Sequence, residues 1–198
     1  KSKSFCFDSE TTDIDANKAE LVGLSFSVKE HEAYYVPLPS VYEESHAIVN
    51  EFKSIFEDEN KIKCGQNIKY DMMMLKWYDV DVKSPLFDTM IAHYLMEPDM
   101  RHNMNILAET YLGYEPVHIE ELIGAKRSEQ ISMRDVAVEK VVAYAAEDAD
   151  VTLQLMNKFQ PIIIENKLHK LFEEVEMPLI PVLAAMETEG VAIDPIAL

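Results

Sequence analysis

The first third of the chain consists mainly of short apolar runs separated by polar links, a pattern typical of β-strands. Three such runs, rich in aromatic and β-branched residues, cover residues 5–10, 21–28 and 33–37. Because short polar links join them, consecutive strands are expected to pair as a meander. A shorter apolar run at 61–64 predicts one more strand.

From residue 44 onward the apolar positions mostly follow helical spacing, three or four residues apart. Helices are predicted over residues 44–56, 67–77, 88–95, 105–112 and 133–157, and again after Pro161 and after Pro178. Gly190 is expected to end the last helix. Strands come first and helices dominate later, which predicts an α/β domain with a mixed central sheet, at least one helical crossover and helices on both faces.

The composition allows one substantial core. The 198 residues are 48% hydrophobic, without a low-complexity stretch. No apolar run approaches the roughly 20 residues of a membrane helix, so no membrane partner is expected. Cys6 and Cys64 lack metal-type spacing, which favours reduced core thiols and a cytoplasmic location. Lys1, in place of an initiator methionine, predicts a fragment of a longer protein.

The charge balance bears on the partner. Thirty-six acidic and 18 basic residues give a formal net charge of −18. This is the wrong sign for tight binding to a phosphate backbone. Two interpretations stay open: the partner is not a polyanion, or divalent cations and a more basic neighbouring domain supply the positive field.

Two short segments place acidic and amide side chains at positions where they share one face of a strand or helix. In the first strand, Asp8 and Glu10 alternate onto one face. Asn67 and Asp71 lie four positions apart at the start of a helix that directly follows a strand. Each segment alone also has a plain structural explanation: acids often end a strand, and Asn67 can cap a helix whose first turn carries a solvated Asp71.

A third segment lies in the long helix predicted at 133–157. Tyr144 and Asp148 stand one turn apart beside its apolar face, among small alanines that allow close approach of another element. Taken alone, this segment is better explained by a surface tyrosine followed by solvated acids.

The four acids say more together than separately. If Asp8, Glu10, Asp71 and Asp148 converge, four like charges repel one another unless cations neutralise them. Oxygen ligands without a Cys/His cluster favour Mg²⁺ or Mn²⁺. Pairs of such ions about 4 Å apart recur in phosphodiester cleavage. The quartet therefore predicts metal-dependent phosphodiester hydrolysis.

The same residues resemble the motifs of the DEDD exonucleases. Residues 7–11 look like the first motif, 67–71 like the second and 144–148 like the third. The family divides by the residue upstream of the last acid: a histidine five positions before it in one branch, a tyrosine four positions before it in the other. Ala143 and Tyr144 place this chain in the tyrosine branch.

Other stretches resemble the proofreading exonuclease of bacterial DNA polymerase I, family A. They are residues 21–26, 65–71, 87–90, 144–155 and 176–182, so the resemblance spans nearly the whole chain. It implies a ribonuclease H-like, DnaQ-like exonuclease fold. The last stretch is similar to the beginning of the polymerase domain, which implies an exonuclease domain over 1–175 and the truncated start of a polymerase domain over 176–198.

The resemblance also implies catalytic roles. Asp8, Glu10 and Asp148 would hold one divalent ion, Asp8 and waters would hold the second, and Asp71 would support that ion from the outer shell. Glu10 and Tyr144 would orient the attacking water. These five are the predicted catalytic residues, and the four acids are the predicted metal residues. The expected cofactors are two Mg²⁺ or Mn²⁺ ions, with Zn²⁺ possible at one site.

Substrate contacts are implied in the same way. Thr11, Ile14, Asn67 and Ile119 would touch the terminal nucleotides, although polymerase I can carry an aromatic residue where Ile119 stands. The expected activity is 3′→5′ removal of nucleoside 5′-monophosphates from single-stranded or frayed DNA.

This activity would act in proofreading during replication and repair, in a bacterial cytoplasm at the nucleoid, with the polymerase domain of the same chain as a partner. Three alternatives stay open: an RNA 3′-end exonuclease of the same superfamily, a non-catalytic scaffold domain of a polymerase, and an acidic protein-binding module.

Overall fold

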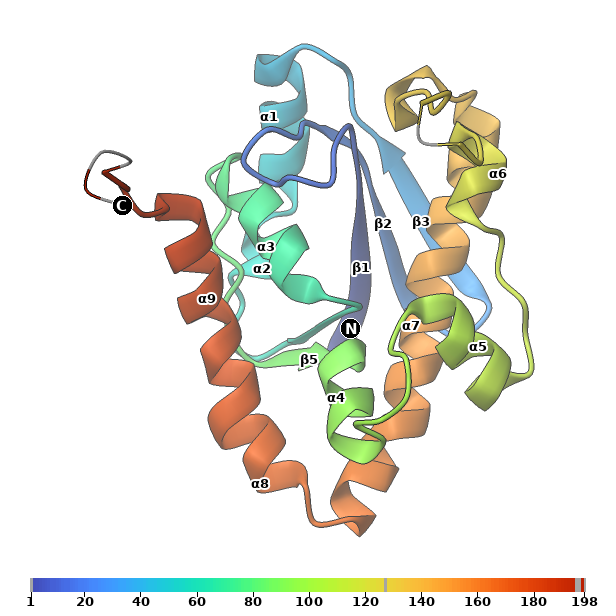
Figure 1. The fold of residues 1–198 in the computed structure, drawn as a ribbon, viewed down its shortest axis with the longest axis vertical. Coiled ribbons are helices and arrows are strands. Elements are labelled where there is room, and N and C mark those ends of the chain that lie inside the picture. The colour runs from blue at the N-terminus through green and yellow to red at the C-terminus, as the bar shows by residue number, and fades with distance from the viewer. Residues whose placement is uncertain (1, 127, 195–196, 198) are drawn as a thin grey trace.

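A five-stranded mixed sheet forms the centre of the molecule, in the order β3-β2-β1-β4-β5, with helices on both faces (Figure 1). The computed structural model describes residues 2–126, 128–194 and 197. The strands are β1 (Ser4–Thr11), β2 (Leu21–Lys29), β3 (Glu32–Pro37), β4 (Ile62–Gly65) and β5 (Leu86–Asp88). β1 to β3 form the predicted meander, whereas β4 runs parallel to β1 and β5 parallel to β4.

The helices complete two layers around the sheet. They are α1 (Tyr42–Glu51), α2 (Lys53–Phe56), α3 (Ile68–Lys76), α4 (Thr89–Met96), α5 (Met104–Leu112), α6 (Ile119–Ile123), the 3₁₀ turn η1 (Met133–Asp135), α7 (Val138–Glu165), α8 (His169–Leu171), the π-helical turn η2 (Phe172–Glu176) and α9 (Met177–Glu189). α7 contacts the first four strands, and α9 packs on α3. The predicted α/β class is confirmed.

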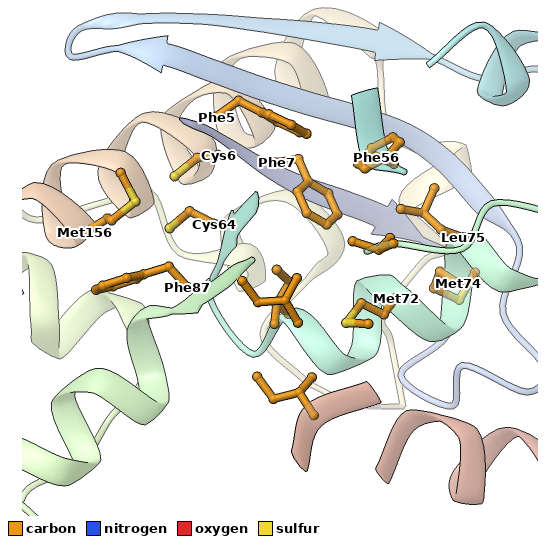
Figure 2. Close-up of a cluster of buried hydrophobic side chains, with 14 of the residues drawn as sticks. Phe5, Cys6, Phe7, Phe56, Cys64, Met72, Met74, Leu75, Phe87 and Met156 are labelled. Carbon is orange, nitrogen blue, oxygen red and sulfur yellow. The ribbon is translucent and has the colours of Figure 1, made fainter. Parts of the chain in front are cut away.

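β1 separates the two layers of the core because its side chains alternate between faces. Phe7 meets Phe56 of α2, with ring centroids 4.9 Å apart. Cys6 pairs with Cys64 of β4 in the sheet register. Figure 2 shows these two cysteines on the side of Met156, which belongs to α7, and Phe7 and Phe56 on the other side. By the same alternation, Asp8 and Glu10 point toward α7.

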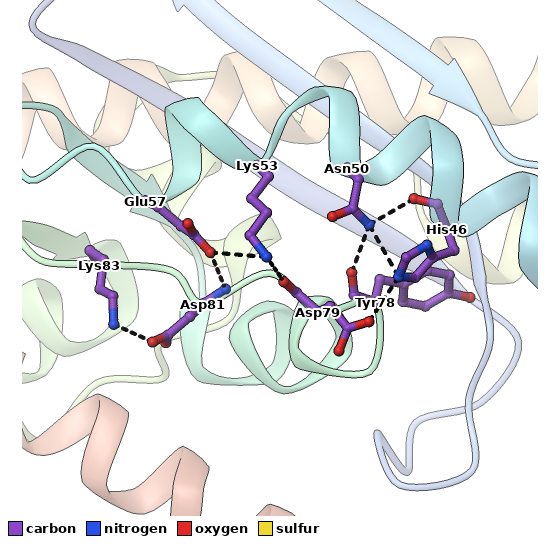
Figure 3. Close-up of polar contacts among 8 residues, drawn as sticks. All are labelled: His46, Asn50, Lys53, Glu57, Tyr78, Asp79, Asp81 and Lys83. Carbon is purple, nitrogen blue, oxygen red and sulfur yellow. Dashed lines mark hydrogen bonds and ion pairs between the residues drawn. The ribbon is translucent and has the colours of Figure 1, made fainter.

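Polar side chains tie α1 and α2 to the loop that follows α3 (Figure 3). The Asn50 amide donates to the Tyr78 carbonyl at 3.0 Å, and the Lys53 ammonium donates to the Asp79 carbonyl at 2.5 Å. His46 Nε2 lies 2.9 Å from a carboxylate oxygen of Asp79. These bonds fix the position of α3, which carries Asp71.

The helix predicted at 44–56 is divided in two. The Phe52 N–H bonds to the Val49 carbonyl, three residues back, and α2 starts anew at Lys53. The Phe52 ring stacks on Phe26 of the sheet at 5.0 Å between centroids. Packing of this ring against the sheet coincides with the break.

The predicted interruption at Pro161 is wrong. α7 begins at Val138, after η1, and continues through Pro161 to Glu165. A proline inside a helix costs roughly 3 kcal/mol. Phe159 and Ile163 are buried on either side of it, and burying side chains of this size contributes about 1.5–3 kcal/mol each. Packing therefore outweighs the lost backbone hydrogen bond.

The last helices form one run from His169 to Glu189, which ends at Gly190 as predicted. The predicted domain boundary at 175/176 falls within this run and stays a prediction, and residues 195, 196 and 198 of its second part lie outside the described residues. In the described part of the chain, no helix combines the length and apolarity needed to cross a bilayer.

Candidate active site

Three of the four predicted acids meet at one point. Asp8 and Glu10 reach it from β1 and Asp148 from α7, and one carboxylate oxygen of each lies within 4.8 Å of the others. Glu10 and Asp148 are each only 5% exposed, and Asp8 is half-buried. Because α7 covers the face to which Asp8 and Glu10 point, strand alternation and helix position together form the cluster.

One oxygen of this cluster has no partner. Glu10 Oε1 is buried and accepts no hydrogen bond from any described residue. A buried polar atom left in this state costs about 1–3 kcal/mol, and more when it is charged. A divalent cation between the three carboxylates would supply the missing interaction, and an oxygen-only donor set suits Mg²⁺ or Mn²⁺.

Asp71 lies next to this cluster but is held differently. It comes from α3, on the opposite side of β1, and Ser9 donates to its Oδ1 through both the backbone N–H, at 3.1 Å, and the hydroxyl. The side chain is 3% exposed, so the alternative of a solvated first-turn acid is wrong. Ser9 stands between Asp8 and Glu10 in β1. Its hydrogen bonds therefore hold the Asp71 side chain beside these two acids.

Burial and mutual repulsion shift the four acids in the same direction. Burial raises the pKa of Asp8 to about 7, although a backbone hydrogen bond from Ser9 lowers it. The pKa of Glu10 is raised by burial and then by the charges of Asp8, Asp148 and Asp71. Burial, followed by the charge of Asp8, also raises the pKa of Asp71 and of Asp148. A bound cation would favour the ionised forms instead.

Tyr144 stands one helical turn before Asp148 and is half-buried. Its pKa is raised first by burial and then by the charges of Asp148, Glu10 and Asp8. The phenol therefore stays protonated at neutral pH and can donate a hydrogen bond. The alternative of a surface tyrosine with solvated acids is wrong for Asp148, which is buried.

A cleft of about 760 Å³ opens beside the acids. All four predicted substrate residues line it, and they share it with three of the acids and the tyrosine: Thr11, Ile14, Asn67, Ile119, Asp8, Glu10, Asp148 and Tyr144. Ile14 is 85% exposed and Ile119 is 39% exposed. The structure thus places apolar side chains and the acidic cluster on one continuous surface.

Asn67 occupies the N-cap of α3 without capping it. Its backbone is left-handed, with φ 61°, and its side chain makes no cap hydrogen bond. Asp88 caps the helix instead: its Oδ2 accepts a hydrogen bond from the Ile68 N–H at 2.8 Å. The alternative in which Asn67 caps the helix is therefore wrong, and Asn67 is one of the residues that line the cleft.

Comparison with known proteins identifies the family. Residues 1–164 match the family model described as 3′-5′ exonuclease. The chain belongs to this exonuclease family. It is therefore a nuclease domain, as predicted.

Among its curated relatives, the exonuclease resembles DNA polymerase I of Borreliella burgdorferi, with 36% identity over 98% of this chain and 21% of that protein. It is 39% identical to DNA polymerase I of Pseudomonas aeruginosa, over 95% of this chain and 22% of that protein. The chain thus spans about a fifth of the length of these relatives. The predicted resemblance to the polymerase I exonuclease is confirmed.

Solved structures support the fold. Brucella melitensis NrnC superposes on the exonuclease with a TM-score of 0.78 at 17% identity, over 99% of this chain and 90% of that one. Identity this low shows the fold alone. The predicted exonuclease fold, a mixed sheet flanked by helices, is confirmed.

Sequence reasoning did not find several residues of the exonuclease cleft. Tyr70, next to Asp71, donates to the Asp13 carbonyl at 2.5 Å and lies 2.6 Å from the Thr11 hydroxyl, so it supports the loop that carries Ile14. Its position beside a motif acid was a signal for it. The other residues have no such signal. Met104 is the first residue of α5, and the rest come from irregular or very short segments: Ile123, Gln130, Ile131, Ser132 and Met133.

Proposed function

We propose that this exonuclease removes nucleoside 5′-monophosphates one at a time from the 3′ end of single-stranded or frayed DNA, as the proofreading part of a DNA polymerase I. The observation that carries the proposal is the group of three carboxylates, with its unpaired Glu10 oxygen, on the wall of a cleft. The two polymerase I relatives support the choice of DNA.

Divalent ions are part of the proposal. Asp8, Glu10 and Asp148 would hold one Mg²⁺ or Mn²⁺ ion, Asp8 would share in a second site, and one of the two sites could take Zn²⁺ instead. Asp71, anchored through Ser9, would support the second ion from the outer shell. When bound, such ions lower the pKa of water and stabilise charge on a phosphate. A structure of NrnC carries bound Mg²⁺, which supports an ion of this kind here.

The remaining steps belong to the protein side chains. Tyr144, kept protonated by burial and by the neighbouring acids, would donate a hydrogen bond that orients the attacking water. Glu10 would accept a hydrogen bond from the same water. With both contacts in place, the water points toward the scissile phosphate, so less entropy is lost in reaching the transition state.

The cleft would take only the last few nucleotides. Ile14 and Ile119 would pack against bases by apolar contact, and Thr11 and the uncapped carboxamide of Asn67 would donate to sugar or phosphate oxygens. A mismatched terminus melts more readily than a paired one, which gives selectivity for errors without reading the bases.

The net charge of −18 implies weak DNA binding by the chain alone. A polymerase domain in the same protein would supply the missing affinity. We include in the proposal the exonuclease domain over 1–175, the start of that polymerase domain over 176–198, and a bacterial cytoplasmic setting at the nucleoid.

One observation favours a second candidate, an RNA 3′-end exonuclease with the same chemistry. NrnC, which shares the fold with a TM-score of 0.77, has been solved bound to pGG. Matched DNA and RNA oligonucleotides of one sequence distinguish the two candidates. Faster shortening of the DNA strand is the expected result, and faster shortening of the RNA strand favours the second candidate.

The decisive experiment uses a 5′-labelled single strand with Mg²⁺ or Mn²⁺. We expect a ladder that shortens from the 3′ end for the parent chain and for Asp81→Ala, an exposed acid outside the cleft. The ladder should disappear for Asp8→Ala. An inactive parent chain, or an equal ladder from Asp8→Ala, contradicts the proposal.

A further inference from the structure

One wall of the cleft is formed by α6, from which Leu122 and Ile123 pack, partly buried, against the small cluster of Val22, Met133 and Val141. α6 contributes Ile119 and Ile123 to the cleft, yet none of its five residues is buried. Its main contact with another element is with α7. A helix this short has too few hydrogen bonds to be stable by itself. Its position over the cleft therefore depends on this small apolar contact and on polar anchors together.

Glu147 of α7 provides two of these anchors. Its Oε2 accepts from the Val117 backbone N–H at 2.7 Å, and its Oε1 accepts from the Tyr114 phenol. Both donors belong to the connection between α5 and α6. Consecutive residues of a helix point about 100° apart, so Asp148 faces the acidic cluster while Glu147 faces this connection. The same turn of α7 therefore carries one acid of the cluster and the residue that holds the α5–α6 connection.

The other hydrogen bonds of the wall, among the described residues, are local or reach only α5. Asn105 of α5 lies 2.8 Å from His118, and the Glu121 side chain accepts from the His118 N–H at 3.3 Å. The Ile131 N–H bonds to the Ile123 carbonyl at 3.0 Å, within the wall itself. Among the described residues, Glu147 therefore provides the hydrogen-bonded link between this wall and the long helix that carries Asp148, beside the apolar contact of Leu122 and Ile123.

We propose that Glu147 is a positioning residue for substrate binding: it holds the α5–α6 connection so that Ile119 and Ile123 stand ready beside the acids. The role rests on the proposed function, because a wall matters only if a 3′ end enters the cleft. Without the two bonds, the wall would have to be ordered each time a strand binds. That entropy cost weakens binding and leaves the chemical step unchanged.

Two substitutions separate position from charge. Glu147→Ala removes the charge and both acceptors. Glu147→Gln removes only the charge, since its carbonyl can accept from Val117 N–H and its amide can donate to the Tyr114 oxygen. Because the Glu147 charge also acts on Asp148, an electrostatic role would make the two variants alike. A positioning role makes Gln resemble the parent.

Asp150 supplies a matched control. It lies on the same helix, and its carboxylate accepts from a backbone N–H, that of His31, at 2.6 Å. His31 lies in the turn between β2 and β3, away from the cleft residues. Asp150→Ala therefore removes a comparable bond without touching the wall.

The test measures kcat and KM for mononucleotide release from a single strand in Mn²⁺, together with hydrogen exchange of the 113–124 amides. For Glu147→Ala we expect KM to rise about tenfold, the order expected from losing two hydrogen bonds, with kcat within about twofold and faster exchange in this segment. Tyr114→Phe should raise KM by less. Glu147→Gln and Asp150→Ala should keep the parent values.

The outcomes are distinct. An active parent chain with an unchanged KM for Glu147→Ala overturns the positioning role alone. Equal loss of kcat in the Ala and Gln variants overturns it in favour of an electrostatic role. A parent chain that releases no mononucleotide overturns the proposed function, and the role that rests on it fails as well.

Discussion

At the scale of single residues, the four acids fall into two groups. Asp8, Glu10 and Asp148 share one point, and an oxygen of Glu10 has no partner among the residues that the structure describes. Asp71 already accepts two hydrogen bonds, both from Ser9. An acid whose hydrogen bonds are made within the protein needs an ion less than an acid without such bonds. Substitutions in the two groups should therefore have different effects.

Asp148→Asn tests the first group. The amide keeps the size of the side chain and removes one of the repelling charges, so the metal-free protein should fold at least as stably as the parent. Loss of a metal ligand should lower kcat/KM about 10³-fold or more. Thermal melting and the 3′-shortening assay measure the two effects. Activity within tenfold of the parent would contradict a ligand role.

Asp71→Asn tests the second group. The amide oxygen can still accept from the Ser9 N–H, so folding should be preserved. In the proposed mechanism, the Asp71 charge acts through its neighbours and not as a direct ligand of the ion. Its loss should therefore lower activity about 10–100-fold. The same kinetic assay, run beside Asp148→Asn, gives the comparison. A loss as deep as that of Asp148→Asn would show that Asp71 binds the ion directly.

At the scale of elements, β2 and β3 meet in a tight contact next to the site. Gly23 of β2 stands opposite Glu10 of β1, and a Cβ on Gly23 would lie 2.2 Å from Cζ of Tyr35 on β3. The Tyr35 hydroxyl donates to the Val22 carbonyl at 3.2 Å, and the ring packs beside Tyr144 in a small apolar cluster. The ring is thus held in place from several sides.

Gly23→Ala should therefore destabilise the fold. Overpacking of this kind costs about 1–3 kcal/mol, which for a chain of this length lowers the melting temperature by several degrees, at about 2–4 °C per kcal/mol. Tyr35→Ala in the same chain removes the clash, so the double variant should lose less than the sum of the two single variants. Additive losses in thermal melting would show that the ring moves aside freely.

Long periodic elements could be predicted from the sequence, and short ones could not. β1 to β3 and α3 to α5 follow clear apolar spacing. β5 has only three residues, Leu86–Asp88, too few to show alternation, and Asp88 caps α4 through Met90 N–H, so the segment resembles a helix start. In α6, Ile119, Leu122 and Ile123 have helical spacing, but five residues are too few for the period to be recognised.

The parts of the site that depend on spacing within one strand or one helix could be predicted from the sequence. Alternation places Asp8 and Glu10 on one face, and one helical turn separates Tyr144 from Asp148. The separate position of Asp71 was not predictable from spacing, because it depends on Ser9, which lies on the other face of β1. The role proposed for Glu147 likewise depends on a contact with a distant segment.

At the scale of the whole molecule, negative charge limits what the metal-free protein can tolerate. The chain carries a net charge of −18, and four of its acids are crowded at one site. The pKa of each of these acids is raised. Folding therefore favours their protonated forms, and stability must depend on pH and on divalent ions together.

The direction of this pH dependence follows from the raised pKa of Asp8. Its pKa is about 7 in the folded chain and near the ordinary 3.8 when unfolded, so the folded state binds more protons between these values. The stability from this group is complete below the unfolded value and is lost as the pH rises through about 7. The other three acids act in the same direction. Without divalent ions, the melting temperature should therefore fall between about pH 6 and pH 8.

Mn²⁺ should reverse this fall, because ion binding requires ionised carboxylates and stabilises only the folded state. The increase in melting temperature on adding Mn²⁺ should be larger at about pH 8 than at about pH 6. The double variant Asp8→Asn, Asp148→Asn is the control. It keeps His93, whose pKa is lowered by burial and which acts in the opposite direction, so the difference between the two proteins isolates the acids. An equal Mn²⁺ effect in both proteins would place the ion elsewhere.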